Sequence, residues 1–338
     1  AKGTKSSIFL WRVLYSFMVD FNCLPSYYWF VFNLRKSNQK INIPFPCTLN
    51  EPMRNHTSFQ IGGPADLFCA PSTAYEIIHI LKYADSCHFP VFILGDGANI
   101  LVSDAGIRGI VIDMSNFSDF SFSKEYTLTA QAGIKVHELA EAAAKRGFAG
   151  VEFFFGLPGT VGGAIYMNAR CYGVSTSDIL SKVTYIDESF EKKTYTPREG
   201  DFTYKTSPFQ HKKAVILEGE FVVQSGDRKN IRETMNSHRA DRNRKGHFDF
   251  PSAGSTFKNN RDFGQPTGKI IDSLGLRGYK IGGAMVSPTH ANIIVNAGGA
   301  TAGDVKRLID HIKEEVYRAY GYILEEEVRY IGEWPEGT

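Results

Sequence analysis

Two glycine-rich segments limit most strongly what this chain can fold into. The first is Gly95-Asp-Gly-Ala-Asn99, which follows the apolar run Pro90–Leu94, a run typical of a short buried strand. The second is Gly156-Leu-Pro-Gly-Thr-Val-Gly-Gly-Ala164. Glycine lets backbone N–H groups come close to phosphate oxygens, although surface turns use the same residues. The first segment is not a dinucleotide fingerprint, because Ile100 stands where G-x-G-x-x-G needs its third glycine.

Regular patterns surround these segments. Thr73 and Glu76 form a capping-box signature that predicts a helix from Thr73 to about Ala84. Helices are also expected over Val136–Arg146, ending on Gly147, and over Ala302–Tyr320, where apolar residues form one stripe. Strands are expected at Pro90–Leu94, Gly109–Met114, Tyr126–Ala132, Lys182–Asp187, Ala214–Val223 and Ile323–Ile331. The short gaps between them favour α+β domains over one doubly wound sheet.

The 338 residues, 43% of them hydrophobic, exceed what one core usually organises. Residues 1–45 are rich in aromatics and are interpreted as an extension of unknown role. A first domain is expected over 46–225, in two subdomains that divide near residue 115. A C-terminal domain is expected over 226–338, after an amphipathic segment near Ile231–His238.

Composition excludes several classes of protein. A net charge of +2, from 38 basic and 36 acidic residues, gives no general attraction to nucleic acid or to anionic membranes. The uncharged run Phe21–Leu34 is shorter than the ~20 apolar residues that span a bilayer, so no membrane insertion is expected. The five cysteines are scattered and odd in number, which favours a reducing cytoplasm over a disulfide framework. No metal-binding constellation stands out.

The segment Pro251-Ser-Ala-Gly-Ser-Thr-Phe-Lys-Asn259 gathers hydroxyls, an ammonium and an amide around a glycine, with Phe257 as its one large apolar side chain. A core strand would alternate apolar and polar residues, so this segment is either a polar turn or a site.

The order of several motifs resembles a known family. Asn55–Asp66, Leu94–Ser103 and Gly156–Asn168 resemble the flavin-binding domain of the p-cresol methylhydroxylase superfamily. With Ser252–Asn259, Gly282–Ala284, His290–Asn292 and Leu324–Gly332, they resemble the MurB family, the UDP-N-acetylenolpyruvoylglucosamine reductases, in its shorter form. The resemblance spans roughly residues 49 to 333.

The resemblance implies a two-part FAD-binding domain followed by a smaller α+β substrate-binding domain. It implies a cytoplasmic step of peptidoglycan synthesis, in which NADPH reduces bound FAD and a UDP-linked enolpyruvyl sugar is reduced to UDP-N-acetylmuramate. The expected partners are these small molecules, and a monomer is expected. The cofactor-binding residues that it implies are Thr57, Gly62, Gly95, Gly97, Ala98, Asn99, Pro158, Gly159, Thr160, Gly162 and Gly163.

The resemblance also implies catalytic roles. Ser255 matches the proton donor of the family, with Lys258 as a candidate to support it, and Glu327 matches the catalytic glutamate. Alternation along a strand would place Glu325, Glu327 and Arg329 on one face. The family usually has Tyr-Arg where Lys205 follows Tyr204, so the positive charge that stabilises the developing enediolate is retained and the bidentate fork of arginine is lost.

For the sugar nucleotide, the resemblance points to Tyr172, Lys245, Asn259 and His290. Arg170, where the family commonly has a small residue, is either directed at a ligand phosphate or an ordinary surface arginine. Two other functions remain open: a flavin oxidase of the same superfamily, and a nucleotide-binding protein without catalysis.

Overall fold

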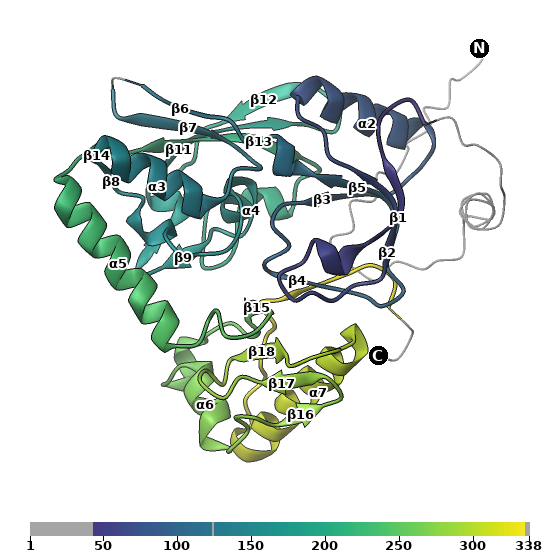
Figure 1. The fold of residues 1–338 in the computed structure, drawn as a ribbon, viewed down its shortest axis with the longest axis vertical. Coiled ribbons are helices and arrows are strands. Elements are labelled where there is room, and N and C mark those ends of the chain that lie inside the picture. Colours follow the sequence, from purple (N-terminus) through teal and green to yellow (C-terminus); the bar gives the residue numbers. More distant parts are fainter. Residues whose placement is uncertain (1–42, 124, 335–338) are drawn as a thin grey trace, which may run out of the picture.

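The computed structural model describes residues 43–123 and 125–334, so most of the expected extension, residues 1–42, lies outside the described residues. Two sheets and their helices form the larger part of the molecule, and a smaller α+β part closes the chain (Figure 1). The described helices include none that is both long enough and apolar enough to cross a membrane.

The first sheet has four strands in the order β1-β2-β5-β3. Strands β2 and β3 run parallel to the central β5, and β1 runs antiparallel to β2. The strands are β1 (Thr48–Pro52), β2 (Pro64–Cys69), β3 (Val91–Leu94) and β5 (Ile107–Asp113), and helix α2 (Ala74–Ser86) connects β2 to β3. The capping box predicted for α2 is present, with Thr73 accepting from the backbone N–H of Glu76, and Ile77 and Ile80 are buried.

The second sheet has five antiparallel strands in the order β12-β11-β13-β7-β6. They are β6 (Phe120–Phe122), β7 (Thr127–Gln131), β11 (Leu180–Ile186), β12 (Lys192–Tyr195) and β13 (Val215–Val222). Helices α3 (Val136–Arg146), α4 (Val161–Tyr166) and α5 (Arg228–Arg244) belong to this part. The predicted end of α3 is confirmed, because Gly147 caps it in the left-handed conformation at φ 76°.

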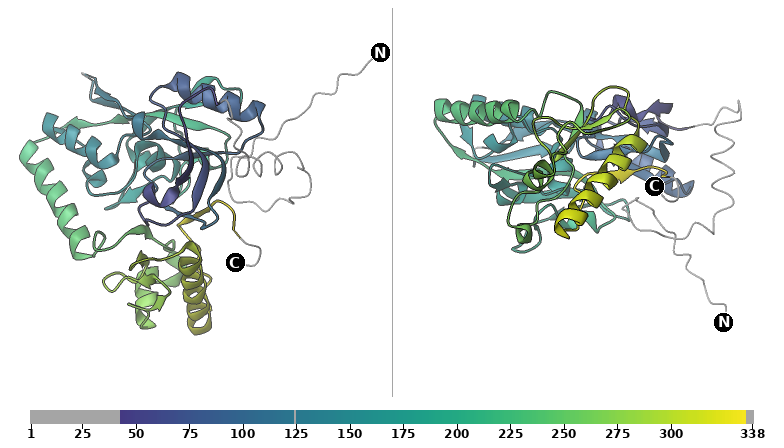
Figure 2. Two further views of the ribbon diagram at one scale, coloured as in Figure 1. Left: turned by 45° about the vertical axis from the view of Figure 1, so that its right-hand side comes forward. Right: turned by 90° about the horizontal axis from the view of Figure 1, so that it is seen from below.

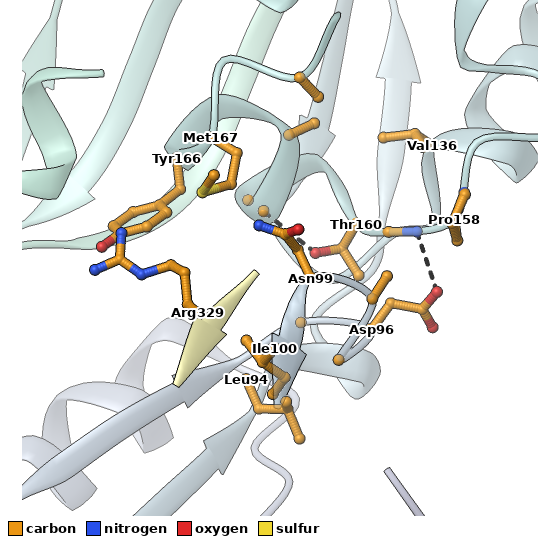
Figure 3. Close-up of a pocket in the computed structure, with 18 of the residues that line it drawn as sticks. Leu94, Asp96, Asn99, Ile100, Val136, Pro158, Thr160, Tyr166, Met167 and Arg329 are labelled. Atoms are coloured by element: carbon orange, nitrogen blue, oxygen red, sulfur yellow. Dashed lines mark hydrogen bonds between the residues drawn. The ribbon is translucent and has the colours of Figure 1, made fainter. Parts of the chain in front are cut away.

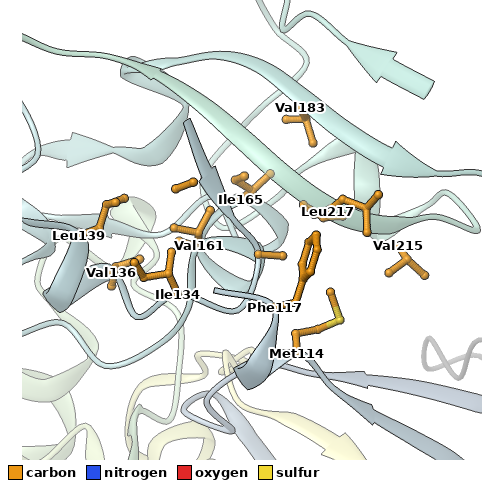
Figure 4. Close-up of a cluster of buried hydrophobic side chains, with 14 of the residues drawn as sticks. Met114, Phe117, Ile134, Val136, Leu139, Val161, Ile165, Val183, Val215 and Leu217 are labelled. Atoms are coloured by element: carbon orange, nitrogen blue, oxygen red, sulfur yellow. The ribbon is translucent and has the colours of Figure 1, made fainter. Parts of the chain in front are cut away.

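One continuous core joins the two sheets. Ile110 and Ile112 of β5 belong to this core, and so do Leu217 of β13 and Val161 and Ile165 of α4. Figure 4 shows part of it. Helix α5 contributes Ile231 and Met235 to the same core and runs along one edge of the molecule toward the closing part (Figures 1 and 2).

The closing part has a four-stranded antiparallel sheet in the order β15-β18-β17-β16. Its elements are β15 (Ser252–Ser255), α6 (Thr267–Ser273), β16 (Lys280–Ile281), β17 (Ala284–Val286), β18 (Ile293–Asn296) and α7 (Ala302–Tyr320). Helix α7 has the predicted bounds, and its stripe from Val305 to Val316 fills a second core. Two-stranded pairs are β8 (Phe148–Ala149) with β14 (Gln224–Ser225) and β9 (Arg170–Cys171) with β10 (Val174–Ser175).

The strand predicted over Ile323–Ile331 is wrong for most of its length. Only β19 (Arg329–Ile331) is a strand, and it pairs in parallel with β4 (Ile100–Val102) of the larger part. The residues before β19 belong to no sheet, so their side chains do not alternate between two faces. Three successive glutamates instead form ion pairs with three different lysines: Glu325 with Lys258, Glu326 with Lys313 and Glu327 with Lys205.

Candidate active site

A cavity of about 590 Å³ lies between the larger part and the closing part. Both glycine-rich loops line it, together with the β9–β10 hairpin, the end of α5, β15 and the segment that leads into β19. Figure 3 shows the loop residues Asp96 and Asn99 facing Pro158, Thr160 and the end of α4. The sequence motifs, some of them more than 200 residues apart along the chain, therefore line one cavity.

The loop glycines are held in conformations that a side chain would disturb. Gly97 has φ +61°, and a Cβ atom there would lie 2.2 Å from the carbonyl oxygen of His56. A Cβ atom on Gly95 would lie 2.5 Å from Oγ1 of Thr160, so the two loops touch at this point. Gly159 has φ +124° with open space beside it. The loops therefore pack closely against the neighbouring chain on one side and are open to the cavity on the other.

Asp96 joins the two loops. Its carboxylate accepts a hydrogen bond from the backbone N–H of Gly159 at 3.1 Å and forms an ion pair with Lys135 at 3.2 Å. Among the hydrogen bonds of the described residues, none is donated by the backbone N–H groups of Asp96, Gly97 or Ala98. Free backbone donors in a glycine loop on a cavity wall suit the phosphates of a dinucleotide.

Most of the predicted cofactor-binding residues line the cavity, and two do not. The lining residues are Gly95, Gly97, Ala98, Asn99, Pro158, Gly159, Thr160, Gly162 and Gly163. Thr57 is buried and its hydroxyl donates to the carbonyl of Ile61, while Gly62 packs against Val102. Because the backbone of residues 56 and 57 lies directly behind Gly97, Thr57 supports the first loop from outside the cavity.

The three predicted catalytic residues all line this cavity, and the backbone N–H of Glu327 donates to the carbonyl of Thr256, the residue after Ser255, at 2.8 Å. Nζ of Lys205 lies 2.5 Å from Oε1 of Glu327, and these side chains are 15% and 11% exposed. Ser255, at the end of β15, lines the same cavity, and its hydroxyl forms no hydrogen bond with another described residue. Lys258 does not support it, because its ammonium pairs with Glu325 outside the cavity lining.

A tight turn presents Lys205. Thr203 and Thr206 exchange two backbone hydrogen bonds of 3.2 Å, and Lys205 at the third position of the turn has φ +61°. A non-glycine residue costs about 1 kcal/mol in this conformation. The turn is held by Gln210, whose amide donates to the carbonyls of Lys205 at 2.9 Å and of Tyr166 at 2.8 Å. The strained backbone is thus fixed to the end of α4.

Asn99 connects the first glycine loop to Glu327, the predicted catalytic glutamate. Its side-chain amide donates to the carbonyl of Glu327 at 3.1 Å, and its own carbonyl accepts from the N–H of Arg329 at 3.0 Å. Asn99 was predicted to bind the cofactor, and the structure also makes it the link between loop and strand.

Three of the four predicted substrate-binding residues line the cavity. Tyr172 stacks on His238 with ring centroids 3.8 Å apart and donates to Asp241 at 3.2 Å, which Lys245 also contacts at 2.7 Å. Hydrogen bonding by Lys245 is the main cause that lowers the pKa of Asp241 to about 2. Burial lowers the pKa of His290.

The fourth substrate-binding residue, Asn259, is exposed and lies outside the lining, with its side-chain oxygen accepting from the N–H of Thr267 at 2.9 Å. Arg170 is exposed and borders the cavity. Sequence reasoning assigned no role to several other lining residues: Asp96, Tyr166, Arg242, His247 and Arg329. The fold brings these residues to the cavity, and no local motif marks them. Arg329, for example, is on a strand three residues long, and its guanidinium carbon lies 5.4 Å from the ring centroid of Tyr166.

Comparisons with known proteins agree with this geometry. Residues 65–189 match the family model described as FAD binding domain, and residues 246–331 match that of the C-terminal domain of UDP-N-acetylenolpyruvoylglucosamine reductase. The fold and the first match define a flavoprotein whose FAD-binding domain, of the p-cresol methylhydroxylase type, precedes a smaller C-terminal domain.

Relatives define the family more narrowly. The chain is 42% identical over 294 residues to UDP-N-acetylenolpyruvoylglucosamine reductase of Borrelia garinii subsp. bavariensis, with 87% of this chain and 95% of that protein covered. It is 40% identical over 285 residues to the reductase of Caldanaerobacter subterraneus subsp. tengcongensis, covering 84% and 93%. The crystal structure of UDP-N-acetylenolpyruvylglucosamine reductase (MurB) from Thermus caldophilus matches with a TM-score of 0.72 and 31% identity, covering 86% and 98%. The chain belongs to the UDP-N-acetylenolpyruvoylglucosamine reductase family.

Proposed function

We propose that this protein reduces the enolpyruvyl group of UDP-N-acetylenolpyruvoylglucosamine to give UDP-N-acetylmuramate for peptidoglycan synthesis, with NADPH as reductant and FAD as bound cofactor. One observation carries the proposal: Ser255 and the ion pair of Lys205 with Glu327 line the same cavity as the two glycine loops. Family membership supports the same reaction. When bound, FAD takes up a hydride from NADPH and supplies it to the enolpyruvyl double bond.

The residues of this chain fit the other requirements of that reaction. Hydride addition builds negative charge on the substrate carboxylate, and the Lys205 ammonium is the fixed positive charge that we assign to it. When this carboxylate enters, it and Glu327 would share the ammonium of Lys205. To the hydroxyl of Ser255, which has no hydrogen-bond partner among the described residues, we assign the proton that the substrate carbon receives.

The residues also fit the cofactor. The two loops would form the FAD pocket, in which the backbone N–H groups of Asp96, Gly97 and Ala98 on the first loop would hold the diphosphate. We assign the sugar nucleotide to the side of the cavity where Tyr172, Lys245 and His290 lie. A cytoplasmic location and a monomeric state are part of this proposal, and sedimentation of the pure protein tests the second.

An anaerobic experiment tests the function. The purified protein is expected to be yellow, to bleach on addition of NADPH, and to regain its colour with the enolpyruvyl sugar but only slowly with oxygen. A protein that cannot be reconstituted with FAD would contradict the proposal. Reoxidation by oxygen as fast as by the sugar would instead favour an oxidase.

A further inference from the structure

Arg242 is a buried cation with no carboxylate partner among the residues that the structure describes. It lies in α5, is 8% exposed and lines the cavity. Within residues 43–123 and 125–334 it forms no ion pair, and its Nε atom is buried without a hydrogen-bond partner. The thiol of Cys171 and the ring of Phe248 lie beside it, and the centroid of that ring is 5.6 Å from the guanidinium carbon. Arginine cannot shed its proton to relieve the cost of burial.

A second buried arginine shows what this chain does elsewhere with such a charge. Arg108 is also 8% exposed, and it forms ion pairs with Asp66 at 2.7 Å and with Glu333 at 3.4 Å. A buried guanidinium normally needs this kind of compensation. At Arg242 the nearest acidic residue in sequence, Asp241, is already engaged by Arg244, Lys245 and Tyr172. No carboxylate of the described residues therefore compensates the charge of Arg242, and an anion that enters the cavity would do so.

The groups around Arg242 suit an anion in the cavity. The rings of His247 and His290 are 5.6 Å apart, both line the cavity, and Nδ1 of His290 is a second buried atom without a hydrogen-bond partner. Burial, with a smaller effect of Arg242, lowers the pKa of His247 to about 4, so its ring is neutral at neutral pH. Arg242 thus supplies the permanent charge, and the histidines supply uncharged hydrogen-bonding groups.

We propose that Arg242 binds the diphosphate of a nucleotide substrate and is a specificity-determining residue of this cavity. The inference rests on the proposed function. A guanidinium presents a planar fork that pairs with phosphate oxygens through two N–H groups. The FAD diphosphate is assigned to the glycine loops, whereas Arg242 is on the same helix end as Lys245, beside Tyr172. The diphosphate of the sugar nucleotide or that of NADPH fits this description.

Binding to the FAD-loaded protein tests the proposal, with UDP, uridine and NADP⁺ as probes in calorimetric titrations. Arg242→Gln is expected to weaken UDP binding by about 10- to 100-fold, as the loss of a charge-assisted hydrogen bond implies, and uridine binding by less than about threefold. Arg244→Gln is the matched control, because Arg244 is two residues away on the same helix and its side chain is 75% exposed. This control is expected to bind UDP like the wild type.

The probes also separate the two sources of the diphosphate. Weaker binding of UDP assigns the site to the sugar nucleotide, and weaker binding of NADP⁺ alone assigns it to the reductant. Equal losses for UDP and uridine, or no loss for either nucleotide, would overturn the proposal. If Arg242→Gln does not fold or retain FAD, Arg242→Lys must still weaken UDP binding more than uridine binding. Turnover by the wild type tests the proposed function separately from this result.

Discussion

Removal of the charge on Lys205 is the most direct test of the catalytic assignment. The side chains of Lys205 and Glu327 are 15% and 11% exposed, so water screens the ammonium only weakly at the place where the substrate carboxylate is expected. Loss of one fixed donor to a developing oxyanion typically costs about 2.7–4 kcal/mol, or a factor of about 10²–10³ in kcat. Lys205→Met keeps the length of the side chain and removes the charge, so we expect a loss of this size.

The assay is the second half-reaction, followed by flavin absorbance in an anaerobic stopped-flow instrument after reduction with NADPH. Lys205→Arg, which keeps the charge, is expected to stay within about tenfold of the wild type, because arginine also serves as an electrostatic donor to carboxylates. Lys258→Met is the matched control: it breaks the neighbouring pair with Glu325, outside the cavity lining, and is expected to react like the wild type. Unchanged hydride transfer to the substrate in Lys205→Met would refute the role of Lys205.

Three further predictions follow from the same geometry. Ser255→Ala should retain FAD and its reduction by NADPH but lose about 10²- to 10⁴-fold in the rate with the enolpyruvyl sugar, measured in the same instrument. Gly97→Ala should lose FAD on gel filtration, because its Cβ would lie 2.2 Å from a backbone oxygen, whereas Gly264→Ala, equally strained at φ +71° but with open space, should keep it. His247, whose pKa falls from 6.5 to about 4 on folding, takes up its proton first in the unfolded chain, so stability should fall as pH drops from about 6.5 toward 4. Thermal unfolding at pH 7 and pH 5 should show a smaller loss for His247→Asn than for the wild type, and equal losses would contradict this assignment.

Local signals predicted the helices well. The capping box at Thr73, the left-handed Gly147 and the apolar stripe of α7 act within a few turns of the chain, so neighbouring residues determine them. The last strand depended on a partner far away in sequence. Only Arg329–Ile331 reaches β4, and the glutamates before it follow the lysines around them instead of a period of two.

The candidate site shows the same division. The glycine loops are visible in the sequence as motifs, and most of the cofactor-binding residues that the family resemblance implied for them line the cavity. Arg242 carries no such signal, because a basic residue near the end of a polar helix usually faces solvent. Only the packing of α5 against the larger core, through Ile231 and Met235, buries it at the cavity wall. Asn259 is the opposite case: its motif is present, but its amide is used at Thr267.

Asn99 gives the two halves of the proposed reaction a common support. One residue of the first glycine loop donates to the carbonyl of Glu327 and accepts from the N–H of Arg329. The β4–β19 pairing begins at the next residue, so loop, glutamate and strand are fixed by consecutive hydrogen bonds. A shift of the first glycine loop that disrupts the proposed cofactor site would therefore also move Glu327. Through the 2.5 Å ion pair it would also move Lys205. The proposed cofactor loop and the proposed catalytic pair Lys205–Glu327 therefore depend on the same few contacts.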